Sequence, residues 1–255
     1  MKPPPSVEGS AGRLVRESSF HDQRFADDTR RQADKFYEVS GSAFAWYRSR
    51  VLAGVAALRV LEYGCGLGTS ALDVARAGGN ATGIDISPVA IDLARQQATE
   101  AGLQQRAEFA VMNAEALECA DASFDRVCGS GILHHLDLSR ALPEIARVLA
   151  PRGYAVFLEP LGHNPAINWY RRRTPMLRTE DEHPLLMRDL LLAHRCFGRV
   201  RVRFFNLATL LAVPLRTTAL FGPAMSVLTA IDKLLLAERS PARRWAWMVV
   251  VEFAH

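Results

Sequence analysis

The sequence predicts an α/β fold in which a parallel sheet carries helices on both faces. Between residues 59 and 160, short apolar segments rich in β-forming residues alternate with amphipathic segments of helical length. Such alternation produces right-handed βαβ units, whose strands lie parallel. A glycine-rich loop follows the first strand segment and an acidic residue ends the second. Both features are typical of ligand sites at the carboxyl ends of parallel strands.

The elements of this region follow one another in a regular order. Strands are expected at residues 59–63, 81–85, 107–112, 125–130 and 154–159, and helices at residues 69–77, 88–101 and 138–149. Ser87 and Pro88 support one helix start, because serine caps a helix and proline fits its first turn. Beyond residue 160 the order is less regular, with a helix expected at 184–196 and strands at 200–205 and 245–253.

The flanking segments suggest how the chain is organised. Residues 1–20 are rich in proline and glycine and are expected to form a disordered tail, followed by a helical N-terminal cover at 21–58. The main domain is expected at 59–255, with insertions at 160–183 and 206–240. Because residues 1–20 lack the apolar core of a secretory signal, we expect a cytoplasmic protein. A peripheral contact with a membrane is one interpretation of the insertion at 206–240, which is apolar.

Composition excludes several classes of protein. Apolar residues make up 49% and charged residues 23%, which is typical of a globular domain. The four cysteines form no Cys-x-x-Cys pair, so neither a disulfide framework nor a zinc-finger site is indicated. Residues 160–255 hold 14 Lys/Arg against 7 Asp/Glu, a net charge of +7. This basic half either is a solvated face or meets phosphate or a membrane, and without interleaved aromatic residues no nucleic-acid partner is expected.

The clearest motif is the glycine loop after the first strand. It contains glycines at positions 64, 66 and 68, and the next residue is Thr69, whereas a dinucleotide-binding loop has glycine there. Glycine is suited to a sharp turn on which a ligand lies against bare backbone. Glu62 ends the strand, where its carboxylate can meet an ammonium group through solvent or backbone. NAD has no such group.

Polar residues also follow the next strands. Asp85 ends the second strand, where a carboxylate can accept both hydroxyls of a ribose. Asn113 and Ala114 close the third strand, where an adenine ring would be flanked. The fourth strand leads through Ser130 into His134-His135-Leu136.

Five motifs occur in one order between residues 58 and 160. They are Glu62-x-Gly64-x-Gly66-x-Gly68, Asp85, Asn113-Ala114, Phe124-Asp125-x-Val127 and His134-His135-Leu136. In this order the chain resembles the class I S-adenosylmethionine-dependent methyltransferases, in particular the branch with the ubiquinone and menaquinone biosynthesis enzymes. The resemblance implies a Rossmann-like, seven-stranded, mostly parallel sheet with the last strand antiparallel. Asn113 departs from the more usual Asp, and Arg152 departs from the pattern near the fifth strand.

The resemblance also implies that S-adenosylmethionine lies across the carboxyl ends of the first strands, with S-adenosylhomocysteine as product. The residues expected to hold it are Glu62, Gly64, Cys65, Gly66, Gly68, Asp85, Ile86, Asn113, Ala114 and Ser130.

Methyl transfer depends mainly on alignment, and a base helps when the acceptor is a hydroxyl or an acidic carbon. The candidates are His135 after the fourth strand, and Glu159 and His163 after the fifth. Alternatively, His134 and His135 shape the cofactor pocket or cap the next helix, and His163 makes a loop hydrogen bond. No metal site is expected, because Glu159, His163, Asp181, Glu182 and His183 follow no known ligand spacing.

The insertion at 206–240 is strongly apolar. Pro214 and Arg216 interrupt it, so neither half reaches the ~20 residues that span a bilayer. It is interpreted as a lid, an interfacial membrane contact, a dimer surface or ordinary packing.

We therefore expect transfer of a methyl group to a small or lipid-like apolar acceptor, at oxygen or carbon. The alternatives are a non-catalytic S-adenosylmethionine-binding protein and a nicotinamide-dependent oxidoreductase. A nucleic-acid methyltransferase is disfavoured, because residues 129–132 read Gly-Ser-Gly-Ile instead of an Asn/Asp-Pro-Pro-Tyr motif.

Overall fold

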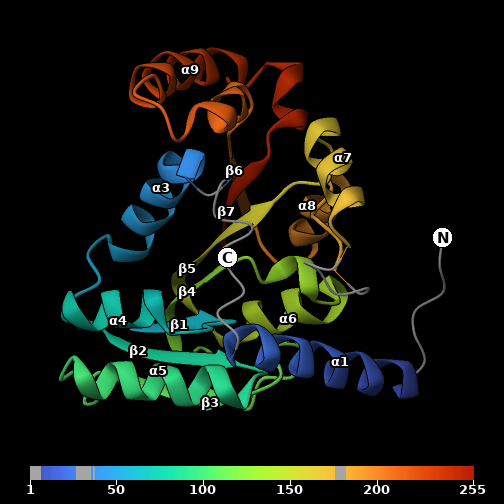
Figure 1. Ribbon diagram of the computed structural model, residues 1–255. Helices are drawn as coiled ribbons and strands as arrows, with labels where there is room; N and C mark the ends of the chain where they lie inside the picture. The colour runs from blue at the N-terminus through green and yellow to red at the C-terminus, as the bar shows by residue number, and fades with distance from the viewer. Residues whose placement is uncertain (1–6, 27–35, 37, 176–181) are drawn as a thin grey trace.

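The computed structural model describes residues 7–26, 36, 38–175 and 182–255, and a sheet forms its centre (Figure 1). The strands are β1 (Arg59–Tyr63), β2 (Asn80–Asp85), β3 (Ala107–Val111), β4 (Phe124–Ser130), β5 (Leu149–Pro160), β6 (Arg199–Phe205) and β7 (Met248–Ala254). Within these residues the sheet has seven strands in the order β3-β2-β1-β4-β5-β7-β6. β1 to β5 pair in parallel, and β7 is antiparallel to β5 and β6. The predicted sheet is confirmed.

Helices cover both faces of the sheet. One face packs against α3 (Gly41–Leu52), α4 (Thr69–Arg76) and α5 (Pro88–Glu100), and the other against α6 (Leu138–Val148) and α8 (Met187–Leu192). β5 shows why both faces are apolar. Val156 and Leu158 pack on the face covered by α3, α4 and α5, and Phe157 packs on the face covered by α6 and α8, because successive side chains of a strand point to opposite faces.

The predicted elements of residues 59–149 match the structure to within a few residues, and three later boundaries differ. β5 begins at Leu149, directly after α6. The helix expected at 184–196 begins at Met187, because Leu185 is still extended and bridges to Leu161. The strand expected at 245–253 begins at Met248, because Pro241–Trp245 form the 3-10 helix η7.

The N-terminal tail is the main correction. Residues 1–20 were expected to be disordered, but Val7–Ala26 form helix α1, which packs beside α5 (Figure 1). Glycine in its first turns weakens its intrinsic propensity, and contacts with the rest of the domain compensate for that weakness. Of the helical cover expected at 21–58, the structure describes the end of α1, η2 (Glu38–Ser40) and α3, while residues 27–35 and 37 lie outside the described residues.

Both expected insertions are present. The first carries α7 (Pro165–Arg173), and the second carries η6 (Ala208–Leu215) and α9 (Phe221–Leu235) between β6 and β7. The buried carboxylate of Asp232 in α9 accepts hydrogen bonds from the backbone N–H groups that begin η6, which ties the two helices together. Among the described residues, we find no helix with the length and apolarity needed to cross a bilayer.

Candidate cofactor and acceptor site

The glycine loop joins β1 to α4 at the carboxyl edge of the sheet. Gly64, Gly66 and Gly68 have φ angles of 63°, 50° and 72°, a region that other residues adopt only at a cost. A Cβ on Gly64 would also lie 2.5 Å from the Ile132 side chain, and one on Gly68 would lie 2.5 Å from the Phe109 ring. The loop therefore needs glycine both for its path and for its packing.

Glu62 is the next-to-last residue of β1 and lies beneath this loop. Its two carboxylate oxygens accept hydrogen bonds from the backbone N–H groups of Ser70 (3.0 Å) and Ala71 (2.8 Å) in the first turn of α4. Burial raises the pKa of Glu62 to about 7, although these hydrogen bonds act in the opposite direction. Glu62 is thus a carboxyl group that changes charge near neutral pH.

Asp85 closes the loop from β2. Its Oδ2 accepts from the N–H of Gly66 (2.8 Å) and its Oδ1 from the N–H of Ser87 (2.9 Å). Cys65 strengthens the same junction, because its backbone N–H donates to the carbonyl of Ile84 (2.8 Å). The thiol of Cys65 is buried, and burial raises its pKa, so this residue contributes backbone and not a reactive thiolate.

The end of β3 forms a compact turn. Asn113 Oδ1 accepts from the N–H of Glu115 (2.9 Å), and the hydroxyl of Tyr63 donates to the carbonyl of Ala114. The predicted adenine-flanking residues therefore lie on a fixed turn next to the end of β2, to which β3 is paired.

Helix α1 covers this edge, which the sequence did not predict. Arg13 donates to the carbonyl of His135 (2.8 Å) and pairs with the fully buried carboxylate of Glu115. Ser18 donates to the carbonyl of Ile86 (3.1 Å). These side chains precede the first motif, which begins at Glu62, by more than 40 positions, and no local pattern in the sequence identifies them. The tail expected to be disordered is thus part of the candidate site.

Two histidines begin the loop after β4, in the 3-10 turn Leu133–His135. Glu159 fixes the first of them. Its Oε2 lies 2.7 Å from His134 Nδ1, and its Oε1 accepts from the N–H groups of Ile132 and Leu133. Since the Glu159 side chain has no exposed surface, it acts here as an anchor for His134 and does not face an acceptor as a base.

His135 meets residues from two distant segments. Its Nδ1 lies 3.2 Å from Glu17 Oε2 in α1, and its ring lies 4.2 Å from that of His134. Burial, followed by the neighbouring His134, lowers the pKa of His135, so its imidazole is neutral at neutral pH. Glu182 completes the group at 3.9 Å from His134 Nε2. We call Glu17, His134, His135, Glu159 and Glu182 the histidine edge.

The remaining expected residues lie elsewhere. His163 Nε2 accepts from the backbone N–H of Met187 (3.0 Å) at the start of α8, which is the loop hydrogen bond considered above. His183 is exposed and its backbone N–H donates to the carbonyl of His134, while Asp181 lies outside the described residues. Ser130 is exposed at the end of β4. The edge thus retains His135 but not His163.

The residues fit the cofactor that the resemblance implies. A carboxylate offers about four lone-pair positions, so Asp85 can accept two hydroxyls in addition to its two backbone N–H groups. Glu62 places a buried carboxylate beside the bare glycine backbone, with its two oxygens on backbone N–H groups of α4.

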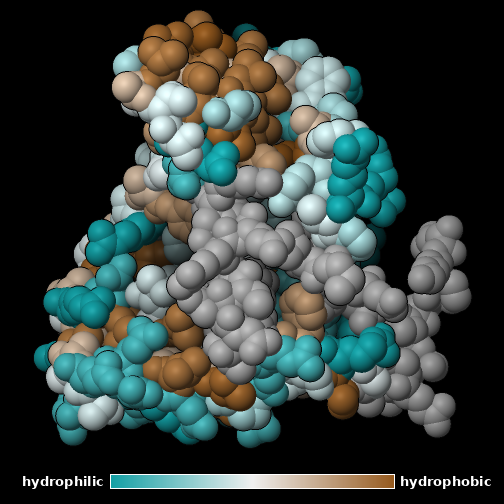
Figure 2. Space-filling view, in the orientation of Figure 1, coloured by the Kyte–Doolittle hydropathy of each residue, from teal (hydrophilic) through white to brown (hydrophobic). Residues whose placement is uncertain are grey.

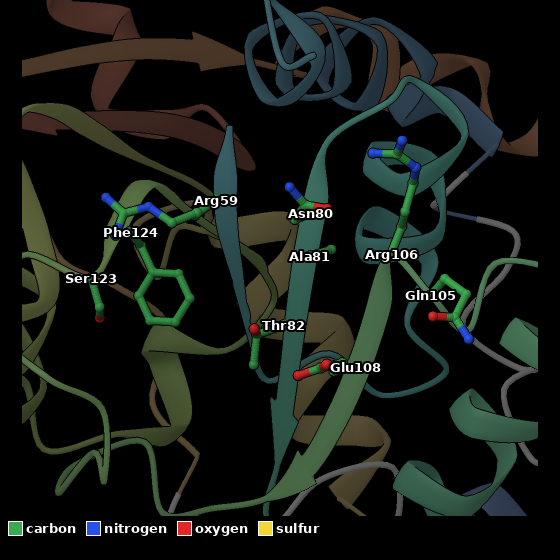
Figure 3. A pocket seen from close by; sticks show the side chains of 9 residues that line it. All are labelled: Arg59, Asn80, Ala81, Thr82, Gln105, Arg106, Glu108, Ser123 and Phe124. Atoms are coloured by element: carbon green, nitrogen blue, oxygen red, sulfur yellow. The ribbon is translucent and has the colours of Figure 1, made fainter. Parts of the chain in front are cut away.

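A pocket at the opposite end of the sheet is unrelated to this site. Its lining includes Arg59, Asn80 and Phe124, which begin three neighbouring strands (Figure 3). Ligands of open α/β sheets bind at the carboxyl ends of strands, and this pocket lies at their amino ends.

Comparison with known proteins identifies the central region. Residues 61–157 match the family described as a methyltransferase domain. Over 123 residues the chain is 35% identical to a ubiquinone biosynthesis O-methyltransferase of Alkalilimnicola ehrlichii, covering 47% of this chain and 48% of that protein. The chain therefore spans about half the length of the curated relatives it matches.

Solved structures resemble this chain over a larger share of its length than the curated relatives do. A geranyl diphosphate C-methyltransferase from Streptomyces coelicolor, in complex with Mg²⁺, geranyl diphosphate and S-adenosyl-L-homocysteine, superposes with a TM-score of 0.59 at 17% identity, over 83% of this chain and 77% of that one. The [4+2]-cyclase SpnF superposes with a TM-score of 0.54 at 22% identity, over 81% and 79%. At these identities the likeness shows the fold alone, and a fold does not fix a reaction.

Proposed function

We propose that the chain is a class I S-adenosylmethionine-dependent methyltransferase and that it transfers a methyl group from S-adenosylmethionine to a small or lipid-like apolar acceptor, at oxygen or carbon. The observation that carries the proposal is the closed glycine loop. Asp85 holds Gly66, and Glu62 holds the first turn of α4, so the loop and both carboxylates are positioned before a ligand arrives.

The chain's own part in the reaction is to bind and align. When bound, the cofactor supplies an electrophilic methyl group on a sulfonium, and an acceptor held in line with it gains most of its rate from proximity. Of the three residues expected to act as a base, His135 stays at the edge of the sheet next to the loop after β4. Its neutral imidazole has a nitrogen lone pair available to a proton or a metal ion.

An apolar acceptor is supported by the surface above the sheet. We call η6, α9 and η7 the apolar cap, and Figure 2 shows it as the most hydrophobic part of the visible face. Leu211, Leu220 and Leu234 are 70%, 63% and 78% exposed. Leucines exposed to this degree in one patch are unusual on a monomeric soluble protein and indicate an interaction surface.

We further propose that the apolar cap contacts an anionic lipid surface. Exposed basic side chains accompany the leucines, namely Arg216, Lys233, Arg239 and Arg244. The one acidic residue within α9, Asp232, is buried. Apolar side chains that enter the headgroup region, with cations beside them, are typical of peripheral membrane contacts.

Vesicle sedimentation tests the membrane contact. We expect the chain to sediment with phosphatidylcholine vesicles that contain phosphatidylglycerol, and less with phosphatidylcholine alone. Leu220→Asp with Leu234→Asp should abolish sedimentation. Leu191→Asp is the matched control, because Leu191 is 66% exposed but lies on α8, outside the cap. Equal sedimentation of the cap variant and the control would contradict the proposal.

A transfer assay tests the methyl transfer. Methyl-labelled S-adenosylmethionine is incubated with the chain and a bacterial cell extract, and label is followed into organic solvent. Asp85→Ala should weaken cofactor binding by about 1–3 kcal/mol through lost charge-assisted hydrogen bonds, whereas the exposed Asp92→Ala should not. Label in the organic phase that depends on Asp85 supports a lipid-like acceptor. Cofactor binding by calorimetry without any transfer would instead support the non-catalytic alternative.

A further inference from the structure

The histidine edge has the composition and arrangement of a metal site. One potential ligand atom from each of His134, His135 and Glu182 lies within 4.8 Å of the others. All three side chains are at least 90% buried. Which nitrogen of each imidazole remains available to an ion depends on which nitrogen already faces a protein partner.

Each imidazole has one nitrogen against a buried carboxylate. His134 Nδ1 lies 2.7 Å from Glu159 Oε2, and His135 Nδ1 lies 3.2 Å from Glu17 Oε2. Both carboxylate side chains are no more than 5% exposed. In metal sites a ligating histidine commonly donates its second ring N–H to a carboxylate, which fixes the tautomer and orients the other nitrogen towards the ion. Here His134 makes that hydrogen bond, and at His135 the Glu17 carboxylate lies within reach of the ring nitrogen without an aligned hydrogen bond.

Glu182 is held beside the two rings by its neighbours. The N–H of His183 donates to the carbonyl of His134 (3.0 Å), which pins this segment to the histidine turn. Arg171 donates to Glu182 Oε1 (2.6 Å), the same oxygen that faces His134, and fixes the side chain. Glu182 Oε1 lies 3.9 Å from His134 Nε2, farther than a direct hydrogen bond and close enough for one ion to be shared.

We propose that His134, His135 and Glu182 bind a divalent first-row transition-metal ion, with Glu159 and Glu17 orienting the two imidazoles. Two imidazoles and one carboxylate are suited to Zn²⁺ and similar ions, whereas Mg²⁺ and Ca²⁺ prefer oxygen ligands. Three protein ligands leave a coordination position open, as in catalytic zinc sites. An oxygen of a hydroxyl-bearing acceptor is the ligand class suited to that position, a part that rests on the proposed methyl transfer.

Calorimetric titration with ZnCl₂ tests the site. The full chain, without an affinity tag and dialysed against chelator, should bind one Zn²⁺, and MgCl₂ should bind far more weakly. Glu182→Gln and His134→Ala should each weaken Zn²⁺ binding by at least 100-fold, and Glu159→Gln by about 10–100-fold because it removes only an orienting partner. His194→Ala is the control, because His194 is an exposed histidine outside the edge.

The thermal midpoint of each variant separates unfolding from ligand loss. Zn²⁺ should raise the midpoint of the original chain and of His194→Ala, but not that of folded Glu182→Gln. Equal Zn²⁺ affinity in Glu182→Gln and the original chain, or no one-to-one binding at all, would overturn the proposal. The proposed metal site and the proposed methyl transfer can fail separately. Zn²⁺ binding tests the metal site alone. Transfer of the methyl label, measured with chelator-treated and with Zn²⁺-loaded protein, tests the reaction.

Discussion

The glycine loop and the histidine edge lie on the same side of the sheet but are built differently. Contacts of the loop join residues that are near in sequence, such as Glu62 with Ser70 and Gly66 with Asp85. The histidine edge joins α1, the turn after β4 and the segment before α8. A single βαβ unit can therefore assemble the loop, whereas the edge requires most of the chain to be folded. Substitutions in the histidine edge should therefore leave the glycine loop folded, whereas substitutions in α1 should disturb the histidine edge.

The largest expected effect is on the loop, through Gly68→Ala. A left-handed φ costs about 1–2 kcal/mol for alanine, and overpacking against Phe109 adds about 1–3 kcal/mol. Gly102→Ala is the matched control, because its φ of 68° is close to the 72° of Gly68 and no atom lies within 4 Å of a Cβ there. Urea unfolding should show a larger loss of stability for Gly68→Ala. Equal losses would mean that the packing of the loop contributes little.

Arg13→Ala tests whether α1 and the loop are separable. Glu115 loses the nearer of the two arginines that face its fully buried carboxylate but keeps Arg140 at 4.0 Å and the N–H of Asp137, so we expect a cost of about 1–3 kcal/mol. Hydrogen exchange should accelerate roughly 10–100-fold across α1 and stay unchanged in the glycine loop. Ser19→Ala, at an exposed position of the same helix, should change neither. Faster exchange in the loop would show that the two regions form one cooperative unit.

The difference between the regions also explains what the sequence could predict. Strand alternation and the three glycines are local patterns, so β1 to β5 and the loop followed from them. The roles of Glu62 and Asp85 beneath the loop add detail to positions that were already expected.

The histidine edge had no such signal. Arg13 and Glu17 lie in a segment whose prolines and glycines indicated disorder, and only the docked helix brings them to His135. Glu159 and Glu182 were recognised as chemically interesting, but spacing along the chain could not show that one of them anchors His134 and the other faces it. Such contacts depend on tertiary packing, which overrides local propensity.

The pH dependence of cofactor binding sharpens the comparison on the loop side. Burial raises the pKa of Glu62 to about 7, so below that pH the ligand-free chain holds a proton on the carboxyl group that we propose meets the ammonium ion of the cofactor. Affinity should therefore be constant above pH 7 and fall below it, by up to tenfold per pH unit. Calorimetry between pH 5 and 8 measures this, and Glu62→Gln should remove the slope. A slope that persists in Glu62→Gln would assign the titration to another group.

The smallest effect concerns His163, which the sequence placed among the bases and the structure places outside the edge. Its Nε2 accepts one hydrogen bond, from Met187 N–H at the start of α8. His163→Ala removes that acceptor and should cost about 1 kcal/mol of stability, with turnover and cofactor affinity little changed. His163→Gln can restore an acceptor and recover part of the stability. A strong fall in turnover in both variants, with stability unchanged, would support His163 as a base that acts on the methyl acceptor. In that case the histidine edge would extend beyond β5, and its assembly would depend on α8 as well as on α1.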